Sequence, residues 1–144
     1  MEQKHYYVET CIWLNLCKKE GDATKGIPYW VLAEDFLEQV DEDNELIFVS
    51  TITLKELFFK LGDKFEEVKQ FFNDNQYIRL IKTAPEDYDL AREFEKNHAL
   101  LSFYDYLHVS ICKRLGCTLV TRDKDLIDFA QEHIDVSKPE DLLR

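Results

Sequence analysis

Glycine and proline are scarce in this sequence, at 4 and 3 of its 144 residues. Their scarcity excludes a collagen-like chain, a flexible linker and low-complexity sequence. No apolar run approaches the roughly 18 residues that span a membrane. The first five residues have neither the basic flank nor the apolar stretch of a signal peptide. A chain of this length buries enough surface for one core and too little for two. We therefore expect a single domain over residues 1–144, cytoplasmic and without a membrane partner.

Cysteine pairs of the C-x-x-C type are also absent, although the chain has 4 cysteines. Cys11 and Cys17 lie six residues apart, and Cys112 and Cys117 lie five apart. Zinc sites and redox motifs need tighter and repeated spacing, and a cytoplasmic chain of this size needs no disulfide. We interpret all four as small buried hydrophobic residues.

Basic residues are few, because 18 Lys and Arg face 29 Asp and Glu and leave a net charge of −11. Nucleic-acid binders usually carry a basic patch, so composition alone argues mildly against nucleic acid and favours a cationic partner. Much of the excess is local and is typical of a solvated helix face and loop. Seven acids without a base make up this segment: Glu34, Asp35, Glu38, Asp41, Glu42, Asp43 and Glu45. Overall charge therefore does not decide the partner.

Short apolar runs alternate with helical periods along the whole chain. The runs predict five strands, at residues 6–8, 46–49, 77–81, 117–120 and 134–136. Helical spacing predicts helices over residues 28–40, 54–61, 65–72, 85–94 and 102–115, with a short one from residue 123. No Asn-Gly or Asp-Gly hairpin turn joins two strands. The pattern predicts an α/β fold with a parallel sheet that helices cover on both faces.

Four acids stand just after predicted strands or at the start of the following helices. They are Glu9, Glu56, Asp105 and Asp123. Each has a structural interpretation, because Thr53 with Glu56 and Ser102 with Asp105 fit a capping box and Asp123 fits an N-cap. Taken together, they are expected at one edge, since the carboxyl ends of parallel strands meet there. Mutually repelling carboxylates are costly unless cations lie between them. Oxygen ligands without clustered His or Cys suit Mg²⁺ or Mn²⁺.

The segments around these acids are YYVET (6–10), STITLKEL (50–57), YDYLHV (104–109) and LVTRDKDL (119–126). In order and spacing they resemble the motifs of PIN-domain nucleases, in the style of the VapC-like toxins of toxin–antitoxin pairs. The resemblance implies a three-layer α/β/α PIN-like domain with a central parallel sheet of about five strands in the order 3-2-1-4-5. It also implies that the four acids surround one or two Mg²⁺ or Mn²⁺ ions and cleave RNA. An antitoxin protein with a basic segment would be a partner, and a homodimer is a further expected assembly.

Neighbouring residues have two interpretations each. By the resemblance, the hydroxyls of Thr10 and Thr121 hold a carboxylate or phosphate oxygen; otherwise they pack at strand ends. His108 lies one turn after Asp105, and we expect a core or hydrogen-bonded histidine rather than a ligand. Asp125 is a fifth ligand or, by our preference, a second acid that complements the helix dipole.

Three more polar side chains lie near the motifs in the sequence. Arg122 and Lys124 either neutralise substrate phosphate beside the metal or keep the surface soluble. Asn15 is expected at an exposed helical position.

One residue departs from the family pattern, because Glu9 stands where the first acid is nearly always Asp. Mg²⁺ demands near-ideal octahedral geometry, so a longer side chain would misplace the carboxylate. The alternative function is therefore a weak or silent PIN-fold interaction module, and Glu9→Asp is expected to raise activity or metal affinity. A receiver-like signalling domain is a further alternative. It needs an acidic pair after the first strand, whereas Glu9 stands alone and the acidic pair follows Val120.

Overall fold

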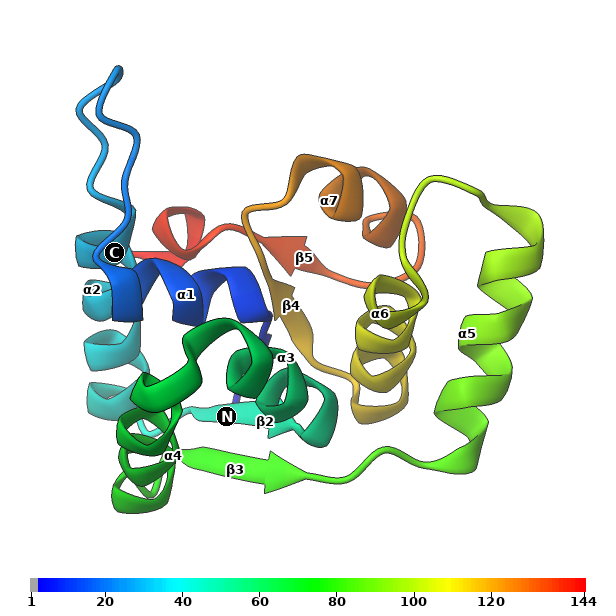
Figure 1. Cartoon of the computed structure of the whole chain (residues 1–144), viewed down its shortest axis with the longest axis horizontal. Coiled ribbons are helices and arrows are strands. Elements are labelled where there is room, and N and C mark those ends of the chain that lie inside the picture. The colour runs from blue at the N-terminus through cyan, green and yellow to red at the C-terminus, as the bar shows by residue number, and fades with distance from the viewer. Residues whose placement is uncertain (1–2) are drawn as a thin grey trace.

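A computed structural model describes residues 3–144 and shows one five-stranded sheet (Figure 1). The strands lie in the order β3-β2-β1-β4-β5, and every neighbouring pair is parallel. They are β1 (His5–Val8), β2 (Leu46–Ser50), β3 (Ile78–Ile81), β4 (Thr118–Val120) and β5 (Val136–Ser137). The order 3-2-1-4-5 and the parallel sheet are therefore confirmed.

Helices cover both faces of the sheet, which gives three layers (Figure 1). They are α1 (Thr10–Lys18), α2 (Tyr29–Glu42), α3 (Thr51–Leu61), α4 (Phe65–Asp74), α5 (Pro85–Asn97), α6 (Phe103–Leu115) and α7 (Lys124–Ala130). Short 3₁₀ turns follow at Gly62–Lys64 and Pro139–Leu142. None of the helices within residues 3–144 is both long and apolar enough to cross a membrane.

The alternation of side chains along β1 divides the core into two clusters. Tyr6 and Val8 point to the cluster that holds the apolar faces of α1, α2 and α4. Tyr7 points to the opposite cluster, which α5, α6 and α7 cover. Successive residues of a strand face opposite sides of a sheet, so the polar group of Tyr7 reaches the α6 side. This placement matters for the site below.

The predicted boundaries differ from the structure mainly at the weak strands. The last strand lies later than predicted, at Val136–Ser137, and the third begins at Ile78. Residues 10–18 form α1, which follows β1 after the single residue Glu9. Ser50 caps α3, because its hydroxyl accepts from the Thr53 amide at 3.2 Å. Helix α3 therefore starts at Thr51, two residues before Thr53, and the predicted capping box of Thr53 with Glu56 is wrong.

Three connections from strand to helix are very short and lie at one edge of the sheet. Strand β1 ends at Val8 before α1, β2 ends at Ser50 before α3, and β4 ends at Val120 shortly before α7. The amino ends of these helices therefore meet at the carboxyl edge, where ligands of open α/β sheets bind.

Candidate metal centre

Glu9 caps the amino end of α1 and is buried, with 7% of its surface exposed. Its Oε2 accepts hydrogen bonds from the Cys11 amide at 3.1 Å and from the Thr121 hydroxyl at 3.2 Å. The first donor belongs to α1 and the second follows β4, so two elements hold this carboxylate in place. Glutamate is an unusual N-cap, since shorter polar side chains are preferred there.

Glu56 reaches the same edge from the second turn of α3. Its Oε1 accepts from the Thr10 hydroxyl at 2.7 Å and from Nε2 of His108 at 2.6 Å. Burial would raise the pKa of Glu56, but the hydrogen bond and charge of His108, together with the Thr10 hydroxyl, lower it below its ordinary value. Burial likewise opposes protonation of His108, yet Glu56 raises the pKa of that imidazole above its usual value.

Asp105 lies in the first turn of α6 and forms the predicted capping box with Ser102. Its Oδ2 accepts from the Ser102 amide at 3.3 Å, and the Asp105 amide donates to the Ser102 hydroxyl at 3.2 Å. Burial raises the pKa of Asp105 above its ordinary value despite these hydrogen bonds, and the charge of Asp123 raises it further. Asp105 is thus both a capping residue and a member of an acidic group.

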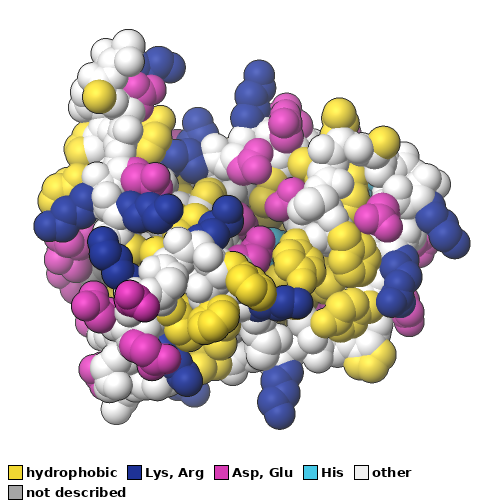
Figure 2. Space-filling model, in the orientation of Figure 1, with side chains coloured by type: hydrophobic (Ala, Val, Ile, Leu, Met, Phe, Trp, Pro, Cys, Tyr) yellow, Lys and Arg dark blue, Asp and Glu magenta, His cyan; other side chains and the backbone are white. Residues whose placement is uncertain are grey.

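Asp123 is the N-cap of α7, as the sequence predicts. Its Oδ1 accepts from the amides of Asp125 at 3.0 Å and Leu126 at 3.3 Å. The side chain is exposed, in contrast to the buried Glu9. Acidic side chains gather in the middle of the face in Figure 2, over the meeting point of α1, α3, α6 and β4.

The four carboxylates share one feature: protein donors occupy one oxygen of each and leave the other without a partner among residues 3–144. The oxygens without a donor are Oε1 of Glu9, Oε2 of Glu56, Oδ1 of Asp105 and Oδ2 of Asp123. A carboxylate oxygen with available lone pairs is the ligand that Mg²⁺ and Mn²⁺ prefer. The donor set therefore fits a hard divalent cation.

The structure brings the predicted residues together to different degrees. Ligand atoms of Glu9, Glu56 and His108 all lie within 4.8 Å of one another, whereas Asp105 and Asp123 are outside this tight group. The charges of Asp105 and Glu9 still act on the pKa of His108, so these side chains share one electrostatic environment.

The contacts of the flanking residues decide between most of the alternative roles that the sequence leaves open for them. Thr10 and Thr121 both donate to carboxylates, which confirms that role for their hydroxyls. His108 is buried and hydrogen-bonded, as expected. The side chain of Asp125 is exposed in the first turn of α7, where an acid complements the helix dipole. Asn15 is half-buried rather than exposed, and its amide donates to Glu20 at 3.2 Å.

Arg122 is already paired within the protein. Its guanidinium donates to both carboxylate oxygens of Glu140, at 2.7 and 2.9 Å, and lies 3.9 Å from the ring centre of Tyr29. A bidentate pair of this kind is among the stronger polar contacts in proteins. Arg122 therefore ties the C-terminal 3₁₀ turn to the loop before Asp123, a structural role that neither interpretation from the sequence includes.

Sequence reasoning missed three polar residues behind the acids. Tyr7, Ser50 and Thr53 are buried, and they connect to His108 through the Tyr7 hydroxyl. In the strand pattern Tyr7 is one of a run of apolar residues. The only signal in the sequence for a buried polar partner was His108, which stands in the apolar stretch of α6.

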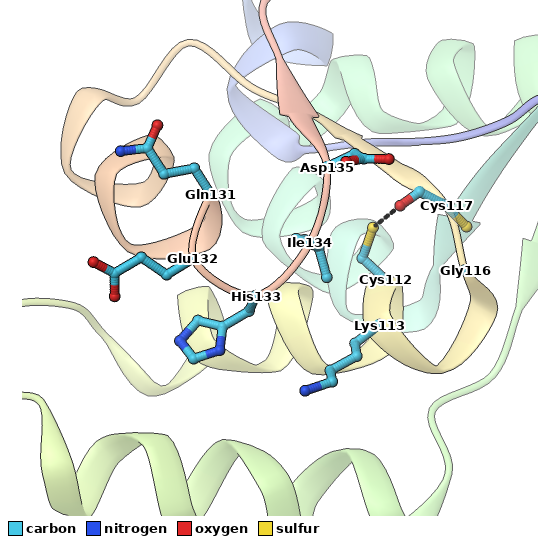
Figure 3. A pocket seen from close by; sticks show the side chains of 9 residues that line it. All are labelled: Cys112, Lys113, Gly116, Cys117, Gln131, Glu132, His133, Ile134 and Asp135. Atoms are coloured by element: carbon cyan, nitrogen blue, oxygen red, sulfur yellow. Dashed lines mark hydrogen bonds between the residues drawn. The ribbon is translucent and has the colours of Figure 1, made fainter.

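A hollow lies at the opposite edge of the sheet (Figure 3). It has a volume of about 490 Å³ and lies between the C-terminal end of α6 and the segment before β5. Cys112 donates to the carbonyl of Cys117 there at 3.0 Å. All four cysteines are free, and Cys112 and Cys117 are buried, as the spacing predicts for that pair; Cys11 and Cys17 are only partly buried.

The sheet order, the three layers and the acids at the carboxyl edge define an α/β/α domain of PIN type. The sequence pattern of the PIN domain matches residues 6–132, and the chain therefore belongs to the PIN-domain family.

Several solved structures are similar in fold. VapBC2 of Rickettsia felis, bound to a promoter DNA fragment, has a TM-score of 0.66 at 20% identity, over 93% of this chain and 98% of that chain. VapC20 of Mycobacterium tuberculosis, described as a sarcin–ricin loop cleaving toxin, has a TM-score of 0.64 at 17% identity, over 86% and 94%. DNA-bound VapBC of Salmonella typhimurium has a TM-score of 0.68 at 14% identity, over 96% and 99%. No curated protein matches the chain.

Proposed function

We propose that this protein is a metal-dependent endoribonuclease. The observation that carries the proposal is the set of four carboxylates, each with one oxygen held by protein donors and one oxygen without a donor. Helix capping explains why acids lie at this edge, where the amino ends of the helices meet, but it does not require two of them to repel each other. The pKa of Asp105 rises, through burial first and then through the charge of Asp123, and a bound cation relieves that cost.

In this proposal Glu9, Asp105 and Asp123 hold Mg²⁺ or Mn²⁺, and Glu56 completes the ring. Such an ion, when bound, makes water a better nucleophile at neutral pH and stabilises negative charge on phosphate oxygens. The residues of the chain provide orientation: Cys11 and Thr121 hold the Glu9 carboxylate, and Thr10 and His108 hold that of Glu56.

Positive charge beside the acids supports an RNA substrate despite the net charge of −11. Lys60 lies close enough to Glu56 for its charge to lower the pKa of that carboxyl. Lys55 is exposed, with Nζ 5.5 Å from the ring centre of Tyr104. In this proposal these lysines contact phosphates of an RNA strand, and phosphate contacts supply much of the affinity for RNA.

The biological setting that we propose is that of a toxin with a protein antitoxin. VapBC pairs are among the similar structures, and VapC20 is described as a toxin that cleaves the sarcin–ricin loop. A basic antitoxin segment suits the acidic edge, because Arg side chains pair bidentately with carboxylates. Such a segment would compete with the metal for the oxygens that lack a donor.

We also propose a homodimer that uses the outer surface of α3 and the edge strand β3. Phe58 and Phe59 on α3 are 55% and 72% exposed, and Leu80 on β3 is 46% exposed. Figure 2 shows hydrophobic side chains gathered over α3 and α6 beside the acids. Large exposed apolar groups that cluster usually mark an interface. Sedimentation should show a dimer for the parent and a monomer for Phe59→Glu; a monomeric parent would contradict the dimer.

The central test is RNA cleavage by the purified protein with Mg²⁺ or Mn²⁺ and with excess chelator. Cleavage should require the ion and should fall by orders of magnitude in Asp123→Asn. Cleavage that persists in chelator would exclude the metal mechanism.

The alternative function is a silent PIN-fold interaction module, which the glutamate at position 9 favours. Titration with Mn²⁺ separates the two, because a module without catalysis has no need to bind the ion. A parent that neither binds Mn²⁺ nor cleaves RNA would support the module.

A further inference from the structure

A row of buried polar side chains stands behind Glu56. Ser50, Tyr7 and His108 come from the amino end of α3, from β1 and from α6, and each has 0% of its surface exposed. The Tyr7 hydroxyl lies 2.6 Å from Oγ of Ser50 and 2.6 Å from Nδ1 of His108. Nε2 of His108 lies 2.6 Å from Oε1 of Glu56. We name Ser50, Tyr7 and His108 the buried relay.

Both ends of the buried relay have a fixed hydrogen-bond direction. At one end the Thr53 amide can only donate, and it donates to Oγ of Ser50. At the other end the ionised carboxylate of Glu56 can only accept. Nε2 of His108 therefore carries the hydrogen that faces Glu56, whether the imidazole is neutral or charged. The Tyr7 hydroxyl can accept or donate, so it matches either state.

The buried relay determines how the Glu56 carboxylate is oriented. Oε1 receives two donors from different directions, His108 on α6 and Thr10 on α1, at 2.6 and 2.7 Å. Two donors on one oxygen fix the carboxylate plane, which a flexible glutamate side chain otherwise samples over several rotamers. Oε2 then has no donor among residues 3–144, and a carboxylate oxygen of Glu56 lies within 4.8 Å of one of Glu9.

Stability alone does not explain this arrangement. The buried relay lies beside apolar side chains, including Leu107, Leu119 and Tyr106. Buried polar groups must all be satisfied, and well-packed apolar replacements are often neutral or stabilising. What the polar row adds is a defined geometry, as the hydrogen-bond partners of metal ligands do in characterised metalloproteins.

We propose that His108 and Tyr7 are positioning residues, which hold Glu56 so that its second oxygen faces the metal. This inference rests on the proposed function, because it takes Glu56 as a member of the metal site. His108 acts through Glu56, and Tyr7 acts through His108.

The affinity of the metal-free protein for Mn²⁺, measured by calorimetry, tests the proposal. His108→Leu should weaken binding by about tenfold or more, the scale of such partners in other metal sites. Tyr7→Phe should weaken binding less, although Tyr7 does not touch Glu56. His108→Gln should bind Mn²⁺ more tightly than His108→Leu, because its amide can still donate to Glu56. The matched control is Ser110→Ala, which removes another buried hydroxyl of α6, one that donates to the Tyr106 carbonyl at 2.9 Å.

Pulsed EPR on bound Mn²⁺ separates positioning from direct ligation. A positioning histidine gives no nitrogen coupling from the His108 ring, whereas a coupling that disappears in His108→Leu would make His108 a ligand and overturn the proposal. Parent-like Mn²⁺ affinity in His108→Leu would overturn it as well.

A second measurement does not depend on metal or RNA. Nitrogen-15 NMR of His108 should show a proton on Nε2, and the ring signals should shift in both Glu56→Gln and Tyr7→Phe. Unchanged ring signals would overturn the buried relay even if the protein cleaves RNA. If the ring signals shift but the protein cleaves no RNA, the proposed function is rejected while the hydrogen bonds of the buried relay are supported.

Discussion

At the scale of single residues, Glu9 shows how a longer side chain is accommodated. Its Oε2 reaches both the Cys11 amide and the Thr121 hydroxyl, and a carboxylate oxygen of Glu9 lies within 4.8 Å of ligand atoms of Glu56 and His108. An aspartate would draw the carboxylate back by one methylene while the two donors stayed in place. The surroundings of Glu9 therefore suit glutamate, and this changes the expectation that the sequence alone gives.

We accordingly expect Glu9→Asp to weaken Mn²⁺ binding and RNA cleavage, by about tenfold on the scale of a misplaced catalytic group. Calorimetry and initial rates against Mn²⁺ concentration check this. A gain in either quantity would show that the site tolerates the shorter acid better, as the family pattern alone suggests. Asp128→Asn, which removes an exposed acid of α7 with no hydrogen bond in residues 3–144, is the control.

Asp105 is the second residue whose environment gives a prediction with a definite sign. Because burial raises its pKa in the folded protein, ionisation lowers the free energy of unfolding as pH rises from the unfolded pKa, about 3.9, through the folded pKa. Asp105→Asn removes that penalty and keeps an acceptor for the Ser102 amide. The metal-free variant should be more stable than the parent at neutral pH, by less than about 1 kcal/mol given partial solvent screening.

The difference in stability should shrink as pH falls toward the unfolded pKa and disappear near about pH 3, where the parent is protonated in both states. Thermal melts across this pH range check the prediction. A variant that is less stable than the parent at neutral pH would show that capping outweighs repulsion.

At the scale of elements, an ion pair joins α5 and α6 and makes no contact with the four site acids. Asp87 is 1% exposed and accepts from Nε and Nη2 of Arg114 at 2.8 and 3.0 Å, and from the Ala84 amide at 2.7 Å. This pair connects the start of α5 to the end of α6. It therefore fixes the helix that carries Asp105 and His108 without contacting either side chain.

We expect Arg114→Ala to destabilise the protein by about 3 kcal/mol, because it leaves a buried carboxylate without its charged partner. Chemical denaturation measures the loss. Mn²⁺ affinity should stay within about twofold of the parent, since metal ligands and this pair are separate groups. A large loss of Mn²⁺ affinity in the folded variant would instead place the ion pair in the support of the site.

At the scale of the whole molecule, the net charge of −11 opposes compaction, and part of it is concentrated at one edge of the sheet. Like charges within a partly desolvated edge destabilise the fold until a cation binds. Most of the remaining acids, such as Glu38 on α2, are exposed and surrounded by water. Metal binding should therefore act on stability through the site acids and not through total charge.

Mn²⁺ at about one hundred times its dissociation constant should stabilise the parent by about 2.7 kcal/mol. The melting temperature should rise accordingly, and Asp123→Asn should lose most of the rise. Glu38→Gln removes the same charge far from the site and should respond as the parent does. Equal loss of the response in both variants would indicate nonspecific screening.

The sequence by itself determined the fold class and the order of the elements. Apolar runs with helical periods between them require strands and helices in alternation, and without hairpin turns the sheet must be parallel. Acids directly after strands then lie at one edge, because parallel strands share the direction of their carboxyl ends. The family motifs around Glu9, Glu56, Asp105 and Asp123 added the strand order, which the structure confirms.

Only the tertiary structure decided the hydrogen bonds of the site. Tyr7 and His108 are 101 residues apart in the chain, and Thr121 and Glu9 are 112 apart. Local patterns report which face of an element a residue occupies, but contacts between such distant residues depend on strand register and helix packing. The same limit hid the pairing of Arg122 with Glu140. Strand register and helix packing also decide which oxygen of each carboxylate accepts a hydrogen bond and which has no donor. The periodicity of the sequence does not encode such small differences in distance.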